Sequence, residues 1–210
     1  SIRVAFEEDD QSHELLCLAK TNQGHKNLMR IISLAHNNYN FQTPIIDFAS
    51  LTELKDDIVV ISGGKDSHIF NLLKRNKTED AEKRIDQFLQ AFDDDFVLEV
   101  QRTNRLDENE YFANLLPLSS KKGIPLIATN DVLFSKEEDF DIHETKVCIN
   151  TGKTLNDPNR EKLFSKEQYF KSSAEMEDLF DGFDELNDKE KAHLNESASG
   201  VKKTNSLLEF

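Results

Sequence analysis

Short apolar runs alternate with longer segments of helical periodicity along most of the chain. The runs Ile58–Ile61, 96–100 and 126–128 have the length and composition of buried strands. Between them, Thr78–Phe92 and 107–122 place apolar residues three and four apart, as amphipathic helices do. Strands that alternate with helices of ten or more residues favour an α/β fold, in which a parallel sheet or barrel is covered by helices.

The rest of the chain extends this pattern. We predict strands at 1–6 and 15–18, helices at 23–37 and 137–150, a loop at 38–44 and a helical turn at 50–54. Three serine-initiated capping patterns predict helix starts: Ser135 with Glu138, Ser165 with Gln168, and Ser172 with Glu175. The first pattern would open the helix at 137–150, and the other two predict short helices around Tyr169 and Leu179.

The composition limits the choice of partners. The 210 residues contain 40 Asp and Glu against 26 Lys and Arg, a formal charge of −14. Because Lys and Arg neutralise phosphates, so acidic a chain is a poor general DNA binder, and proteins, small molecules or cations are its more natural partners. No apolar run approaches the length of a membrane span, so we expect a cytoplasmic protein. Cys17 and Cys148 lie in apolar stretches and fit reduced, buried thiols.

Two polar segments follow predicted strands, where α/β folds usually place their sites. The segment 129–131, Thr-Asn-Asp, follows the strand at 126–128, and Asp131 there is either a metal ligand or a turn residue. The segment 62–66, Ser-Gly-Gly-Lys-Asp, either cradles a phosphate through its backbone amides or is an ordinary glycine turn. It lacks the spacing of a Walker A loop.

Other charged residues have plainer interpretations. Glu99 and Arg102 lie near a strand end, where a salt bridge or structural hydrogen bond is the default and a substrate contact the alternative. The acidic run 93–95 is expected to be a solvated loop. Asp139, Asp141 and Glu144 suit an exposed helix face. None of the six histidines has an H-x-H spacing, and His143 falls inside a predicted helix.

Several motifs together resemble one known family. They are IATNDVLF at 127–134, EDFDIHE at 138–144 and TGKTLNDP at 151–158, supported by GHKNL at 24–28, ISGG at 61–64, LEVQRT at 98–103, QYF at 168–170 and SAEMEDLF at 173–180. In this order they resemble the amino-terminal PHP (polymerase and histidinol phosphatase) domain of bacterial DNA polymerase III alpha subunits. The resemblance covers roughly residues 1–186.

The resemblance implies a fold and a domain division. The family fold is a distorted (β/α)7 barrel, so we expect an incomplete barrel of this type that lacks its first βα units and the family's H-x-H motif, with a short helical carboxy-terminal extension. Residues 1–186 would form the PHP-domain segment, and 187–210 a polar tail or linker toward the polymerase region. An unclosed barrel leaves open strand edges, through which copies of the segment can associate.

The resemblance also implies a degenerate metal site. Members that bind metal carry a histidine where this chain has Glu14, one residue after His13, and a cysteine where it has Gly64. Asp131 is kept, but the histidine two residues later is Leu133. Because glycine and leucine cannot bind metal, we expect no catalytic residue, metal or other cofactor in this segment, with Asp131 as a vestigial ligand position.

The implied function is a part in DNA replication. The parent alpha subunit is a DNA-directed DNA polymerase, a nucleotidyltransferase that uses Mg²⁺, and the segment would be a silent domain that stabilises the polymerase region and docks the proofreading exonuclease subunit. The rival is a metal-dependent phosphoesterase or 3′–5′ exonuclease that uses Asp131 with Glu14 or His13. A third hypothesis, single-strand binding through Lys121, Lys122 and Arg102, conflicts with the acidic charge, and we expect neither strong nucleic-acid binding nor membrane contact.

Overall fold

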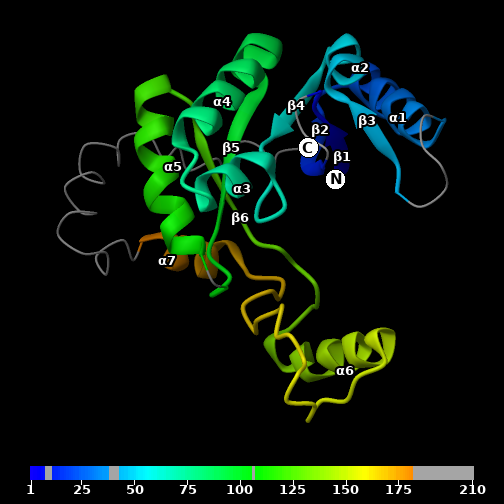
Figure 1. The fold of residues 1–210 in the computed structure, drawn as a ribbon, viewed down its shortest axis with the longest axis vertical. Helices are drawn as coiled ribbons and strands as arrows, with labels where there is room; N and C mark the ends of the chain where they lie inside the picture. The colour runs from blue at the N-terminus through cyan, green and yellow to red at the C-terminus, as the bar shows by residue number, and fades with distance from the viewer. Residues whose placement is uncertain (8–10, 38–42, 106, 182–210) are drawn as a thin grey trace.

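The computed structural model describes residues 1–7, 11–37, 43–105 and 107–181 (Figure 1). The predicted tail at 187–210 and most of the predicted loop at 38–44 lie outside these residues. The strands are β1 (Ile2–Ala5), β2 (Ser12–Ala19), β3 (Ile45–Asp47), β4 (Ile58–Ile61), β5 (Phe96–Gln101) and β6 (Leu126–Thr129). The helices are α1 (Asn22–Asn37), α2 (Phe48–Glu53), α3 (His68–Lys74), α4 (Thr78–Phe92), α5 (Glu108–Lys122), α6 (Phe140–Thr151) and α7 (Ser173–Asp181).

The six strands form one mixed sheet in the order β3-β1-β2-β4-β5-β6. The pairs β1–β3, β4–β5 and β5–β6 are parallel, but β2 is antiparallel to both of its neighbours. The first half of β2 pairs with β1 and its second half with β4, so this strand joins two groups of parallel strands. The α/β class is therefore confirmed, whereas a wholly parallel sheet is wrong.

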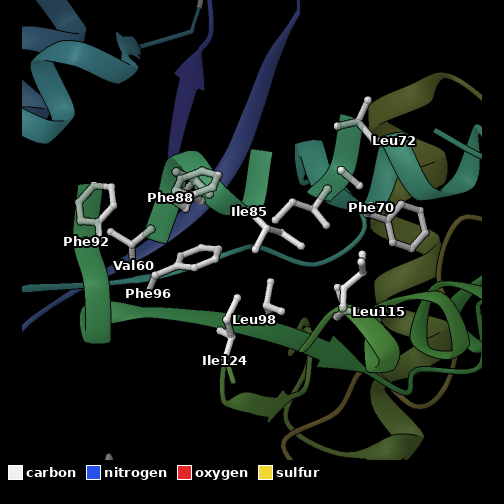
Figure 2. Packing of buried hydrophobic residues seen from close by; sticks show 14 of the residues in the cluster. Val60, Phe70, Leu72, Ile85, Phe88, Phe92, Phe96, Leu98, Leu115 and Ile124 are labelled. Carbon is white, nitrogen blue, oxygen red and sulfur yellow. The ribbon is translucent and has the colours of Figure 1, made fainter. Parts of the chain in front are cut away.

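The strands present alternate residues to two faces, as the period of a β-strand requires. One face carries Val60, Phe96 and Leu98, which pack with Ile85 and Phe88 of α4 in the main core (Figure 2). The rings of Phe88 and Phe96 are stacked with centroids 4.7 Å apart. The other face carries a smaller cluster of buried residues, Val59, Ile61 and Val97, with Leu16, Leu18 and Ile127 packed against it.

Two short elements were not predicted from the sequence. Strand β3 has three residues, too few for a periodic signal. Helix α3 has seven residues, of which five are buried, so it shows no polar stripe by which an amphipathic helix is recognised. Its first turn is capped by the Ser67 hydroxyl, which accepts a hydrogen bond from the Phe70 amide at 3.0 Å.

The capping patterns had mixed outcomes. Ser172 and Glu175 bond to each other's backbone amides and open α7 as predicted. The Ser165 amide donates to Gln168 Oε1, but the Ser165 hydroxyl accepts the Glu167 amide and no helix follows; Tyr169 instead makes a parallel bridge with Phe134. The predicted Ser135 start is wrong as well. The Lys136 amide donates to Asp139, a 3₁₀ turn covers Glu137–Asp139, and α6 begins at Phe140.

Helix α6 stands apart from the sheet in Figure 1 and packs on the segment that follows it. Its Glu144 is buried and pairs with Arg160, so the prediction that Glu144 lies on an exposed face is wrong. Asp141 is exposed as predicted, and Asp139 is half-buried. Cys148 of α6 is a buried free thiol. Cys17 on β2 is half-buried and also free, and burial raises the pKa of its thiol to about 12.

Helix α1 lies against the β3–β1–β2 end of the sheet, and Gly24 allows its close approach to the turn before β4. A Cβ atom at residue 24 would overlap the carbonyl oxygen of Asp57 and lie 3.1 Å from the Asp57 Cβ. The Asn27 side chain bonds to the neighbouring Asp56 carbonyl at 3.0 Å, which fixes the contact.

Replacing this glycine should therefore lower stability. In an unconstrained helix Gly→Ala is stabilising, by roughly 0.5–1 kcal/mol. Here the clash with Asp57 should make the substitution destabilising. We expect Gly24→Ala to lower the free energy of unfolding by about 1–3 kcal/mol, the usual cost of overpacking. Urea denaturation measures the change, and Ser33→Ala on the exposed side of α1 is the control. A Gly24→Ala variant as stable as the wild type would contradict the described packing.

Candidate functional site

The carboxyl ends of β4, β5 and β6 meet at one edge of the sheet and enclose a pocket of about 240 Å³. The loop after β4 and the polar tip after β6, which the sequence singled out separately, both line it. Glu14 of β2 and Glu99 of β5 lie in the same pocket. The structure thus brings together Glu14, Gly64 and Asp131, three of the four positions at which the family resemblance implied ligands.

Asp131 is held by two side chains from distant parts of the chain. Its Oδ2 accepts a hydrogen bond from Arg105 Nη1 at 3.0 Å and another from Gln168 Nε2 at 2.9 Å. Gln168 is completely buried, and its segment is tied to the tip by Asn130, whose amide donates to the Glu167 and Tyr169 carbonyls. The Asp131 carboxylate is therefore a structural acceptor in this pocket.

Arg105 connects the walls of the pocket. Its guanidinium also donates to Gln101 Oε1 at 2.9 Å and Glu108 Oε1 at 3.1 Å, while the side chain is 11% exposed. The Glu108 carboxylate in turn accepts the Thr103 amide at 2.7 Å. One buried cation thus joins the end of β5, the start of α5 and the tip after β6.

Glu99 is a buried carboxyl at the centre of the pocket. It accepts hydrogen bonds from the Thr129 hydroxyl and from Gln101 Nε2, the latter at 2.9 Å. Burial raises the pKa of Glu99; these two bonds oppose the shift, and the nearby Asp131 and Glu14 charges add to it. Arg102 donates instead to the Leu179 carbonyl at 2.8 Å, so the prediction of structural hydrogen bonds for this pair is confirmed.

The glycine loop is folded tightly against the pocket wall. Gly63 has φ of 80°, and a Cβ on Gly64 would lie 2.6 Å from the amide carbon of Gln101. The Asp66 carbonyl accepts the Glu14 amide at 3.1 Å, which pins the loop to β2. A larger side chain at residue 64 would displace Gln101. The phosphate interpretation of this loop stays a prediction.

His13 does not belong to this site. Adjacent residues of a strand point to opposite faces, so Glu14 faces the pocket while His13 enters the helix-covered core. There it is buried, with its ring stacked on His68 at a centroid distance of 4.3 Å and tilted against Phe6 at 6.2 Å. The pairing of His13 with Asp131 in the enzyme hypothesis is therefore wrong.

Three of the four implied ligand positions hold a residue that is bonded elsewhere or cannot bind metal. Asp131 is bonded to Arg105 and Gln168, and Gly64 offers no ligand atom. Leu133, 39% exposed, contributes only a backbone amide bond to the Gln168 carbonyl. Nowhere in the described ranges do three His, Cys, Asp or Glu side chains come close enough to hold an ion. A guanidinium lies among the carboxylates in place of an external cation.

The lysines proposed for single-strand binding have protein partners. Lys121 pairs with Glu82 at 2.5 Å, and Lys122 pairs with Asp86 at 2.5 Å and Glu82 at 3.2 Å. In the acidic run 93–95, which forms a 3₁₀ turn, Asp95 pairs with Lys20 at 2.6 Å. Each of these cations is therefore paired with a carboxylate of this chain.

Sequence reasoning missed Arg105 and Gln168. Arg105 follows a strand end in LEVQRTNR, and a cation four residues beyond Gln101 could have been weighed as a partner for the nearby acids. Gln168 lies 37 residues from Asp131 in the sequence, and no spacing rule connects them.

Comparison with known proteins first identifies the domain family of this chain. Residues 1–103 match the family model of the PHP domain, so this part of the chain is PHP-domain sequence. Over 81% of its length the chain is 40% identical to DNA polymerase III subunit alpha of Vibrio cholerae and 39% identical to that of Pasteurella multocida. The Escherichia coli K12 subunit is 37% identical over the same share. The chain is a homologue of these alpha subunits and spans 15% of the length of each.

One further finding concerns membranes. In the part of the chain that the structure describes, every helix is too short or too polar to cross a bilayer.

Removing Arg105 should be costly. Arg105→Met leaves Glu108, whose side chain is 8% exposed, without its cation, and breaking a buried pair costs roughly 3–5 kcal/mol. Lys83→Met on α4 removes an exposed pair with Asp80 and should cost at most about 1 kcal/mol. Urea denaturation of both variants measures the difference. Equal, small losses would show that Arg105 does not hold the pocket together.

Glu99 should make stability depend on pH. A carboxyl whose folded-state pKa is raised stabilises the fold below its unfolded-state pKa, about 4.3, and this contribution is lost as pH rises through the folded-state pKa. We therefore expect Glu99→Gln, which keeps the acceptor oxygen, to gain stability relative to the wild type as pH rises from about 4 to 8. Denaturation curves across this range measure the difference in free energy of unfolding between the variant and the wild type. A difference that does not change with pH would contradict a raised pKa of Glu99.

Proposed function

We propose that the chain is a segment of a replicative DNA polymerase III alpha subunit and contributes a catalytically silent PHP domain to it. The homology to alpha subunits over 81% of the chain supports this assignment. DNA-directed nucleotidyl transfer, with its Mg²⁺, would then belong to parts of the parent protein outside this chain. The parent would act in the cytoplasm, where the chromosome is replicated.

The observation that carries the silent assignment is the bonding of Asp131. A hydrolytic metal centre needs several ligands that converge on an open position. Here the retained acid is neutralised by Arg105 and bonded to Gln168, while residues 64 and 133 are glycine and leucine. We assign no catalytic residue, metal or other cofactor to this segment, and we interpret Asp131 as a former ligand that now stabilises the fold.

We assign the domain a structural and protein-binding role in the replicase. In this proposal residues 1–186 form an incomplete (β/α)7-type barrel that stabilises the polymerase region and docks the proofreading exonuclease subunit, with 187–210 as the linker. The net charge of −14 is compatible with docking, because it speeds encounter with a basic partner and disfavours DNA. The end strands β3 and β6 are the edges through which copies of the segment would associate.

The rival is a metal-dependent phosphoesterase or 3′–5′ exonuclease. The observation that favours it is the presence of Glu14, Glu99 and Asp131 in one pocket. For this chemistry Arg105 would have to leave Asp131 and expose the carboxylates to a metal ion. Single-strand binding through Lys121, Lys122 and Arg102 has less support, since all three side chains are bonded to protein groups.

Metal and activity measurements separate these functions. The purified chain should contain no stoichiometric zinc or manganese by elemental analysis, and should not hydrolyse bis-p-nitrophenyl phosphate or a single-stranded oligonucleotide with added Mn²⁺. Asp131→Asn should leave both results unchanged, as should the control Asp141→Asn on the exposed side of α6. Stoichiometric metal together with hydrolysis that Asp131→Asn abolishes and Asp141→Asn keeps would establish the enzyme instead.

A further inference from the structure

Among the described helices, α1 and the shorter α3 carry no acidic residue. The sixteen residues of α1 contain no Asp or Glu, although the whole chain has 40 of them. Each of the helices α4, α5, α6 and α7 carries at least two acidic residues. Helix α1 instead carries Lys26, Arg30 and two histidines, so it adds positive charge to a chain whose net charge is −14.

The outer side of α1 is also apolar. Its inner side is buried against the sheet through Gly24, Asn27, Ile31 and Ala35. On the outer side Met29 is 50% and Ile32 48% exposed, whereas Leu34, 38% exposed, lies on the opposite flank of the helix. Met29 and Ile32 are three residues apart, so they lie next to each other on the helix surface. In Figure 1 this helix lies at one side of the molecule, away from α5, α6 and α7.

The cations on this surface are available for a partner. Lys26 and Arg30 are exposed and four residues apart, which places them side by side along the apolar stripe. Neither forms an ion pair with another residue in the described ranges. By contrast, Lys20, Lys74, Lys121 and Lys122 each bind a carboxylate of this chain. We call four exposed side chains of this helix the α1 surface: Lys26, Met29, Arg30 and Ile32.

We propose that the α1 surface docks an acidic amphipathic helix of another polypeptide. Carboxylates of the partner would pair with Lys26 and Arg30, and its apolar stripe would cover Met29 and Ile32, in the manner of helix-to-helix ridge packing. Charge complementarity identifies the partner as acidic, and the exposed aliphatic side chains identify it as a protein. A phosphate backbone would use the two cations but gain nothing from the apolar residues.

This site is separate from the pocket at the strand ends and does not depend on the function proposed for it. The acidic helices α4 and α7 of the same chain are packed elsewhere, since Ala81, Ile85 and Phe88 of α4 and Phe180 of α7 belong to the main core. Neither can cover the α1 surface within one molecule. Binding to a second copy would require the acidic outer side of α4 to meet α1 of another molecule.

The test uses the full chain and a synthetic peptide probe. The probe is a helix-forming peptide of roughly five turns, with leucines three and four apart and glutamates elsewhere; a scrambled peptide of equal composition has no apolar stripe. Fluorescence anisotropy measures the Kd, and amide chemical shifts locate the site. We expect the probe to bind more tightly than the scrambled peptide, with shifts confined to α1.

Matched variants test the two parts of the α1 surface. Lys26→Glu/Arg30→Glu should weaken binding about tenfold or more, and Met29→Ser/Ile32→Ser should weaken it by a similar factor. The control Lys77→Glu/Lys83→Glu makes the same charge change on exposed residues in and just before α4 and should leave the Kd within about twofold. Circular dichroism confirms that each variant is folded.

Several results would overturn the proposal. The scrambled peptide could bind as tightly as the probe, or the probe could shift amide signals outside α1. The Lys77→Glu/Lys83→Glu control could also weaken binding as much as the α1 variants do. Tighter binding of a single-stranded oligonucleotide to α1 would identify a nucleic-acid site instead. Concentration-dependent self-association that Lys26→Glu/Arg30→Glu abolishes would identify a second copy as the occupant.

Discussion

The contact between Arg105 and Asp131 is the interaction on which the carboxyl edge of the sheet depends. Arg105 lies just beyond β5, reaches Glu108 at the start of α5, and bonds Asp131 beyond β6. Through Asp131 it is linked to Gln168, whose buried side chain fixes the segment leading to α7. Because a guanidinium offers donors in several directions, one side chain can orient all of these elements. No aliphatic residue could do so.

The same contact explains how the pocket tolerates its carboxylates. Acids that face each other across a small space need protons, a metal ion or an internal cation. Asp131 has the cation, whereas burial raises the pKa of Glu99, and the nearby Asp131 and Glu14 charges add to this shift.

The sequence predicted the parts of this arrangement that are local. An unbroken β-branched run located β4, a short apolar run located β5, and helical periodicity located α4 with its observed bounds. Asp131 was correctly placed at a strand end, in a pocket with Glu14 and Gly64. The sequence could not show that β2 runs antiparallel to its neighbours, because the direction of a strand in a sheet is set by its pairing and not by its composition. The bonds to Asp131 were missed for a similar reason: they cross 26 and 37 residues of sequence, and only the folded sheet brings them together.

The cations of this protein fall into two groups, those paired with carboxylates of the fold and those left exposed. Where cations serve the fold they are bound to acids: Arg105 in the pocket, Arg160 beside Glu144, and Lys122 between α5 and α4. Lys26 and Arg30 of α1 are exposed and form no ion pair within the described ranges, as is also true of Arg75 and Lys146, so they differ in this respect from the cations of the pocket. Their position beside exposed aliphatic side chains, on a helix without acids, favours recognition of an acidic partner over a role in stability.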